Sequence, residues 1–160
     1  MTGEDIPGLV CFTTLGNATG HIRVAIEKLQ PSELVIFTSS DLHDPARPVY
    51  KEIIDSGVSL RDIILLHPFE HGALEKMISR MLMAYQTYIT KQSNSALVSL
   101  TGGTNLMAVA MGLFALIQGL DAYYVLNDST HDIMPITLFE SMNQLKTLSA
   151  MKTRLIEVQV

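Results

Sequence analysis

The chain has 160 residues, of which 48% are hydrophobic and only 17% are charged, and its formal net charge is −5. This length suits one domain, residues 1–160, whose hydrophobic core needs neither a disulfide nor a structural metal. The acidic balance excludes an extended surface for long nucleic acid, because such surfaces depend on clustered Lys and Arg. The single cysteine, Cys11, lies in an apolar run, so no disulfide framework is expected.

The beginning of the chain has neither the basic start nor the apolar stretch of a signal peptide. No segment approaches the roughly twenty apolar residues that a membrane-spanning helix needs. We therefore expect a cytoplasmic protein with no membrane partner. Because the chain has more apolar side chains than a small monomer readily buries, we also expect it to associate through an apolar face.

Short apolar runs alternate along the chain with segments in which apolar residues recur at helical spacing. The runs predict buried strands at residues 8–15, 34–38, 62–66, 95–100 and 121–126. The helical patterns occupy residues 22–29, 49–54, 74–85 and 106–117, and the last of them is apolar on nearly all sides. A further strand at 133–139 contains Pro135, which suits the edge of a sheet. The core then covers about residues 6–140, and residues 141–160 fit either a helix or a final strand.

This alternation predicts an α/β, Rossmann-like domain of three layers, with a mainly parallel central sheet and helices on both faces. In such sheets ligands bind outside the carboxyl ends of the strands, where the strand order reverses. The polar residues that follow the predicted strands would therefore gather at one edge. They are Thr13, Thr14, Gly16, Asn17, Ser39, Ser40, His67, Glu70, His71, Thr101, Gly102, Gly103, Thr104, Asn105, Asn127 and Asp128.

The segment from Thr101 to Asn105, with sequence Thr-Gly-Gly-Thr-Asn, joins one predicted strand to the helix that begins near Thr104. Its two glycines permit backbone angles and close approaches that a Cβ would block, and the first amides of the helix have no partners within the helix. Amides of this kind bind anions, typically phosphate. Similar glycine pairs also serve only to connect a strand to a helix, so both interpretations stay open.

Other chemistries fit the sequence less well. No segment matches the G-x-G-x-x-G pattern of dinucleotide oxidoreductases or the Gly-Lys-Ser/Thr ending of a P-loop. His67 and His71 are spaced like a metal pair, but Pro68 prevents a continuous helix and no third ligand is evident, which favours loop or substrate contacts. We expect His21 to be a solvated surface residue, with anion contact as the alternative, and Cys11 to be a buried hydrophobe rather than a nucleophile. No metal and no cofactor are expected.

Residues 100–107, Leu-Thr-Gly-Gly-Thr-Asn-Leu-Met, precede an apolar helix and the segment Asp-Ala-Tyr-Tyr-Val that starts at Asp121. This arrangement resembles the second signature of CARF domains, the CRISPR-associated Rossmann-like sensors. The strand that ends in Thr-Thr-Leu-Gly at residues 13–16 is similar to the first signature. The resemblance spans about residues 6–140. It implies a homodimer that binds cyclic oligoadenylate, the second messenger of type III CRISPR antiviral defence. The expected ring is cyclic tetraadenylate.

A CARF domain without an effector domain resembles the ring nucleases, which cleave the messenger and switch the response off. A ribose 2′-hydroxyl attacks the adjacent phosphate without a metal ion, so the protein holds the geometry and stabilises the developing charge. Carried over from the resemblance, the candidate catalytic residues are Thr14, Asn105 and His71. The candidate ligand-binding residues are Thr13, Gly16, Asn17, Ser39, Ser40, Thr101, Gly102, Gly103 and Thr104.

The chain departs from the family pattern at Asn105, where the motif commonly ends in lysine. A neutral amide donates a weaker hydrogen bond to phosphate than a charged group does. Either His21, Arg23, His71 or a C-terminal Lys or Arg supplies the charge, or the protein is a non-catalytic sensor or sponge that recruits a separate effector. A third alternative is an unrelated nucleotide-binding Rossmann-like module.

Overall fold

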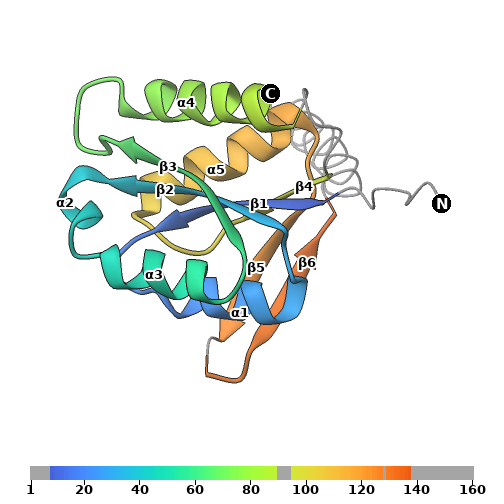
Figure 1. The fold of residues 1–160 in the computed structure, drawn as a ribbon. Helices are drawn as coiled ribbons and strands as arrows, with labels where there is room; N and C mark the ends of the chain where they lie inside the picture. Colours follow the sequence, from blue (N-terminus) through green and yellow to red (C-terminus); the bar gives the residue numbers. More distant parts are fainter. Residues whose placement is uncertain (1–7, 90–94, 128, 138–160) are drawn as a thin grey trace, which may run out of the picture.

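The computed structural model describes residues 8–89, 95–127 and 129–137. Strands and helices alternate along these residues (Figure 1). They are β1 (Leu9–Leu15), α1 (Gly20–Leu29), β2 (Glu33–Ser39), α2 (Ser40–His43), α3 (Arg47–Asp55), β3 (Ser59–Leu66), α4 (Ala73–Tyr88), β4 (Ser95–Ser99), α5 (Asn105–Gln118), β5 (Ala122–Asn127) and β6 (Asp132–Ile136). The predicted strands and helices of the core are confirmed, whereas the expectation for residues 141–160 lies outside the described residues.

The strands form one sheet in the order β3-β2-β1-β4-β5-β6. Neighbouring strands from β3 to β5 are parallel, and β6 pairs antiparallel with β5. The carboxyl ends of β1, β2 and β3 point to the left in Figure 1. The order of the strands along the sheet reverses between β1 and β4, because the chain builds outward from β1 to β3 and then returns to place β4 on the other side of β1.

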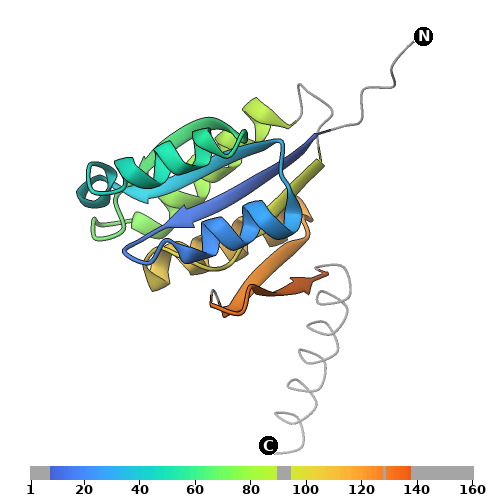
Figure 2. The same cartoon turned by 60° about the horizontal axis from the view of Figure 1, so that its bottom comes forward.

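Two hydrophobic clusters lie on opposite faces of this sheet. On one face α4 and α5 pack through Met77, Met81, Phe114 and other apolar residues against inward-facing residues of the strands, including Phe12. On the other face α1 and α3 pack against residues such as Leu15. Figures 1 and 2 show the resulting arrangement of a sheet between two helical layers. The predicted Rossmann-like α/β fold with a mainly parallel sheet is therefore confirmed.

The buried face of α3 differs from the prediction. In the helical pattern predicted for residues 49–54, the apolar face consists of Val49, Ile53 and Ile54, but Ile54 is 59% exposed. Residues 46, 50 and 53 face the sheet instead, at i, i+4 and i+7, so that Tyr50 is buried in place of Ile54. The short helix α2 was not predicted, because four residues are too few to show a helical period.

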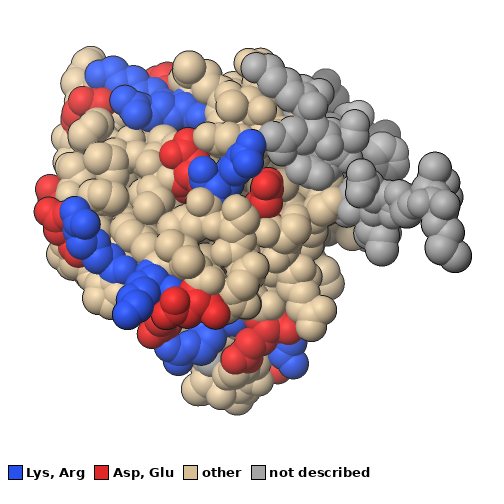
Figure 3. Space-filling view, in the orientation of Figure 1, with Lys and Arg blue, Asp and Glu red and all other residues tan. Residues whose placement is uncertain are grey.

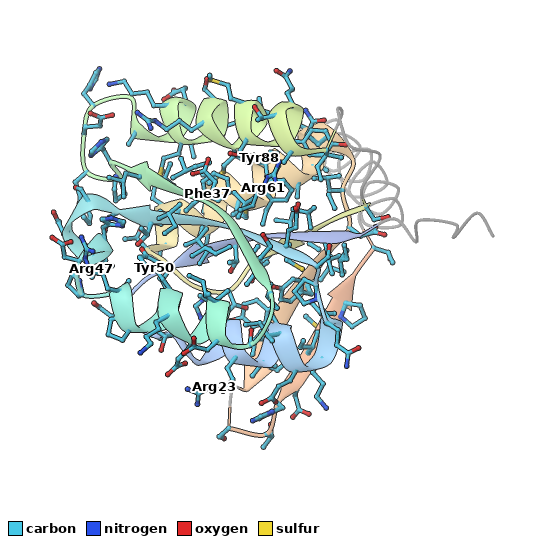
Figure 4. The ribbon with its side chains drawn as sticks, viewed as in Figure 1. Arg23, Phe37, Arg47, Tyr50, Arg61 and Tyr88 are labelled. Atoms are coloured by element: carbon cyan, nitrogen blue, oxygen red, sulfur yellow. The ribbon has the colours of Figure 1, made fainter. Side chains whose placement is uncertain are left out.

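Both edge strands of the described sheet carry features that interrupt further strand pairing. In β6, Pro135 has no amide proton to donate. In β3, the Asp62 carboxylate accepts the amide proton of Ile63 at 2.8 Å and the hydroxyl proton of Tyr88 at 2.6 Å. This hydrogen bond to Asp62, followed by burial, raises the pKa of Tyr88 to about 12. Arg61 covers the Tyr88 ring, with its guanidinium carbon 5.4 Å from the ring centre (Figure 4).

Helix α5 is buried on one side and leaves an apolar row on the other. Val109, Leu113 and Ile117, spaced four residues apart, are 52%, 37% and 60% exposed. Tyr124 and Met134, which face each other across β5 and β6, are also exposed. They lie on the α5 side of the sheet. Ala122 and Ile136 stand two positions from them on the same strands, so they share the same face, and both belong to the hydrophobic cluster under α5.

We term this surface, made of Val109, Leu113, Ile117, Tyr124 and Met134, the α5–β5 face. Its apolar character agrees with the expectation that the chain has an apolar surface left over after folding. Among the helices in the described ranges, none has the length and apolar content required to cross a bilayer.

Candidate functional site

Strands β1 and β4 separate near their carboxyl ends. Their pairing ends at Phe12 and Val98, while β1 stays paired with β2 as far as Leu15 and Thr38. The last residues of β1 therefore extend beyond its ladder with β4, at the point where the strand order reverses. The loops that follow the two strands meet here. We term this contact, formed by Thr14, Gly16, His21, Gly102 and Gly103, the β1–β4 junction.

The junction is so tight that its glycines cannot carry side chains without displacement of neighbouring atoms. A Cβ on Gly16 would lie 3.0 Å from the Cα and nitrogen atoms of Gly103. A Cβ on Gly102, whose φ is +109°, would lie 2.5 Å from the carbonyl oxygen of Thr14. Gly103 has a φ of +72°. The prediction that these glycines permit unusual backbone angles and close approaches is confirmed.

Two hydrogen bonds join the parts of the junction. The hydroxyl of Thr14 donates to the carbonyl of Gly102 at 2.8 Å, and Nε2 of His21 lies 2.8 Å from the carbonyl of Thr14. Because a carbonyl can only accept, the His21 proton that serves this bond is on Nε2. The turn after β4 is thus tied to β1, and β1 is tied to α1.

The expectation of a solvated His21 is wrong, since the residue is only 4% exposed. His21 shares the inward face of α1 with Val24 and Ala25, which are also buried. These residues stand three and four positions after it, the spacing of one helix face. The helical periodicity of residues 21–25 therefore contained the signal that His21 is buried.

Helix α5 begins at the junction. Thr104 is its N-cap, and the Thr104 hydroxyl accepts the amide proton of Met107 at 3.2 Å. The first turn contains no acidic side chain that would oppose an anion. Since the N-terminus of a helix carries partial positive charge, α5 directs that charge to the same edge of the sheet as the two glycine loops.

The predicted site residues differ in how far they are exposed. Thr13, Thr14 and Ser39 are buried, with 1%, 0% and 5% of their surface exposed. Thr101 is half-buried, and its hydroxyl accepts the amide proton of Val125 at 2.8 Å. These hydroxyl groups support the ends of the strands. Among the candidate catalytic and ligand-binding residues, Asn17, Ser40, His71 and Asn105 are exposed.

The structure does not bring His71 next to Asn105. His71 is exposed in the loop after β3, and β3 stands three strands away from β4. With a spacing of about 4.8 Å between neighbouring strands, this places the two strand ends about 14 Å apart. In the loop of His71, Glu70 forms an ion pair with Lys76 at 3.3 Å.

The arginine that the sequence offered as a replacement for lysine is engaged elsewhere. Arg23 forms an ion pair with Glu52 at 3.1 Å, which joins α1 to α3 (Figure 4). On the face shown in Figure 3, blue and red atoms lie side by side, with no broad blue patch. Within the described ranges, no group of three or more His, Cys, Asp or Glu is placed to hold a metal ion. The C-terminal Lys and Arg residues lie outside those ranges.

Cys11 is completely buried in β1, as predicted. Burial raises the pKa of its thiol to about 12. The reactive form of cysteine is the thiolate, so this environment suppresses nucleophilic chemistry at Cys11.

A hollow of about 430 Å³ opens between α1 and α3. Apolar residues such as Ile22, Ile26 and Val49 line it together with the Arg23–Glu52 ion pair. Neither Gly16 nor the Gly102–Gly103 turn contributes to its wall. The β1–β4 junction, which combines the glycine loops with a helix N-terminus, is therefore the better candidate for an anion site.

Comparison with known proteins identifies the fold but not a family. No protein-family model matches the sequence, and no relative is found among curated proteins. Solved structures do match. Can2 from Sulfobacillus thermosulfidooxidans, solved in complex with cyclic tetra-adenylate, superposes with a TM-score of 0.60 and 14% identity over 79% of this chain and 34% of its own. Csm6 from Enterococcus italicus, bound to cyclic hexa-2′-fluoro-hexa-dAMP, superposes with a TM-score of 0.62 and 15% identity over 76% of this chain and 34% of its own.

A third structure is a type III CRISPR defence DNA nuclease activated by cyclic oligoadenylate. It gives a TM-score of 0.60 and 19% identity over 73% of this chain and 18% of its own. The chain thus spans about a third or less of the length of these proteins. At such low identity the likeness concerns the fold alone: the chain has the mixed α/β, Rossmann-like fold found in part of three proteins that bind or respond to cyclic adenylates.

Proposed function

We propose that this chain is a CARF-like protein that binds cyclic oligoadenylate at the β1–β4 junction, with cyclic tetraadenylate as the expected ring. The observation that carries the proposal is the junction itself. Two glycine loops and the N-terminus of α5 meet at the point of strand-order reversal. This is the region in which open α/β sheets bind ligands. The fold is shared with parts of Can2 and Csm6, which were solved with cyclic adenylates.

The chemistry of the junction suits a small ligand with several phosphates. Backbone amides and the positive end of α5 bind phosphate oxygens through hydrogen bonds and partial charges. Asn105, exposed at the first position of α5, adds an amide donor at this edge. With a formal net charge of −5, the protein gains little from long-range attraction of polyanions, so affinity comes from these local donors.

The proposal includes a homodimer, and its support is the α5–β5 face. A stable interface between copies of a chain has an apolar centre, which this row of exposed apolar side chains provides. Replacement of Ile117 by lysine places a charge at that centre and is expected to yield a monomer. Ile54→Lys is the matched control, because Ile54 is 59% exposed and Ile117 60%, but Ile54 lies on α3 at the opposite face. Sedimentation velocity distinguishes the two variants, and a wild-type chain that is monomeric at micromolar concentration rejects the dimer.

The proposal extends to slow cleavage of the ring as a ring nuclease. A ribose 2′-hydroxyl gives up its proton to water as its oxygen forms a bond to the adjacent phosphorus, the bond from phosphorus to the 5′-oxygen breaks, and the 5′-oxygen takes up a proton from water. The products end in a 2′,3′-cyclic phosphate and a 5′-hydroxyl. In this scheme Asn105 donates a hydrogen bond to the phosphate, Thr14 holds the Gly102 turn, and His71 meets another part of the ring.

A second candidate function is binding without turnover, as a sensor or sponge that acts through a separate effector. Two observations favour it. Asn105 replaces the lysine of the family motif, and the hydroxyl of Thr14 is buried and donates to Gly102. The amide of Asn105 is a neutral donor, which stabilises the charge that develops during cleavage less well than a lysine at this position would.

Incubation of the purified protein with radiolabelled cyclic tetraadenylate and a metal chelator separates these candidates. Linear products that end in a cyclic phosphate, with a lower yield in Asn105→Ala than in the surface control Thr87→Ala, support cleavage. An intact ring bound at stoichiometric amounts supports the sensor. If cyclic oligoadenylates of every ring size fail to bind, the proposed function is rejected in favour of an unrelated nucleotide-binding module.

A further inference from the structure

His21 occupies a place that packing alone does not explain. Its ring fills the space beside Gly102, where a Cβ would lie 2.4 Å from Nε2 and 2.7 Å from Cε1. A buried imidazole costs free energy unless its polar atoms are hydrogen-bonded, whereas a leucine or methionine would fill similar space at lower cost. The identity of the residue therefore points to the hydrogen bond that Nε2 makes.

That hydrogen bond belongs to a continuous chain across the junction. Nε2 of His21 donates to the carbonyl of Thr14 at 2.8 Å, and the hydroxyl of Thr14 donates to the carbonyl of Gly102 at 2.8 Å. Thr14 lies past the last residue of β1 that pairs with β4. In that stretch, contacts of this kind take over from the ladder in holding β1 against the loop that follows β4.

The Gly102–Gly103 turn depends on such contacts because its own backbone is permissive. Glycine populates left-handed and right-handed conformations with similar ease, so two consecutive glycines leave a turn with many alternatives. The observed φ values of +109° and +72° represent one of them. A turn that must order on binding loses affinity, and a turn already held in place does not.

We propose that His21 is a positioning residue of the β1–β4 junction: through Thr14 and the space beside Gly102, it holds the Gly102–Gly103 turn in its anion-binding conformation. His21 does not touch the ligand in this arrangement. The part of the inference that concerns affinity rests on the proposed binding of cyclic oligoadenylate, whereas the part that concerns the turn does not.

Two variants separate the hydrogen bond from the packing. His21→Gln keeps an N–H donor on a side chain of similar reach, and His21→Leu keeps the bulk without the donor. We expect His21→Leu to bind cyclic tetraadenylate about fivefold more weakly than wild type, and His21→Gln to stay within about twofold, because one buried hydrogen bond contributes about 1 kcal/mol, which corresponds to about fivefold in affinity. His43→Leu is the control. His43 lies on α2 and contacts Tyr50 of α3, outside the junction, so this variant is expected to bind the ligand as wild type does.

Amide NMR spectra without ligand test the turn directly. We expect the amide signals of Gly102 and Gly103 to shift or broaden in His21→Leu and to stay near their wild-type positions in His21→Gln. If His21→Leu does not fold, Thr14→Val removes the next donor in the chain and is expected to produce the same glycine shifts and the same loss of affinity.

The inference is overturned if His21→Leu leaves both the glycine signals and the affinity unchanged, or if His21→Gln is as impaired as His21→Leu. Either result would mean that His21 only fills space. If wild-type protein binds no cyclic oligoadenylate, the proposed function fails, while the glycine signals still decide whether His21 holds the turn.

Discussion

Replacement of Gly102 by alanine tests whether the β1–β4 junction is as tight as its geometry indicates. Gly57 provides the matched control, because it also has a positive φ, +88°, but no atom lies within 4 Å of the Cβ that alanine would add. Gly57→Ala therefore carries only the strain of a left-handed backbone, about 1 kcal/mol. Gly102→Ala carries a similar strain at a φ of +109° and adds contacts of 2.5 Å with the Thr14 carbonyl oxygen and 2.4 Å with His21.

Contacts of that length force neighbouring atoms to move, and overpacking of this kind costs about 2 kcal/mol. We therefore expect Gly102→Ala to lower the free energy of unfolding by about 3 kcal/mol and Gly57→Ala by about 1 kcal/mol. For a chain of this length, the losses correspond to roughly 9 °C and 3 °C in melting temperature.

Urea denaturation followed by circular dichroism measures both values under the same conditions. The quantity compared is the difference between the two losses in free energy of unfolding, to which the wild-type value contributes equally. Equal losses in the two variants would refute the reasoning, since they would show that the turn relaxes away from His21 and Thr14 at no cost.

Three further predictions concern groups outside that contact. Above pH 9 the Cys11 thiol of the unfolded chain loses its proton, whereas the folded thiol, with a pKa raised to about 12 by burial, keeps it. The free energy of unfolding therefore falls by up to about 1.4 kcal/mol per pH unit above pH 9. Cys11→Ala is expected to remove this contribution to the pH dependence of stability. Parallel slopes would contradict the burial argument. Tyr88→Phe removes the 2.6 Å hydrogen bond to Asp62 and is expected to cost about 1 kcal/mol in urea denaturation, with no loss if water replaces the hydroxyl. Thr104→Ala removes the N-cap of α5 at a cost of about 1 kcal/mol, and Thr104→Ser is expected to restore stability; a neutral alanine would show that the cap is not needed.

The fold followed from the sequence because its strands are buried on both faces. Residues such as those of β1 and β2 form continuous apolar runs, which is the pattern of parallel strands covered by helices. Polar turn residues at the ends of these runs then predicted the edge at which a ligand would bind, which stays a prediction. The role of Gly102 and Gly103 was also predicted, since glycine adopts the positive φ values found there with far less strain than other residues do.

The direction of individual side chains was harder to predict. The sequence placed Thr13 and Thr14 at the end of a strand but did not show that both hydroxyls turn into the protein. His21 was expected at the surface, because polar residue type outweighed its place on the buried face of α1. The separation of His71 from Asn105 depends on strand order, which a list of strand ends does not contain.

The edges of the described sheet also limit how copies of this protein meet. Where an edge strand offers free amides and carbonyls, chains join through backbone hydrogen bonds, and growth by strand addition has no natural end. Here Pro135 lacks a donor on β6, and Asp62 occupies the Ile63 amide on β3. These edges disfavour backbone pairing between copies, whereas the α5–β5 face offers exposed apolar side chains to the proposed dimer. In the proposed dimer, one charged substitution within the α5–β5 face would therefore be enough to weaken the association.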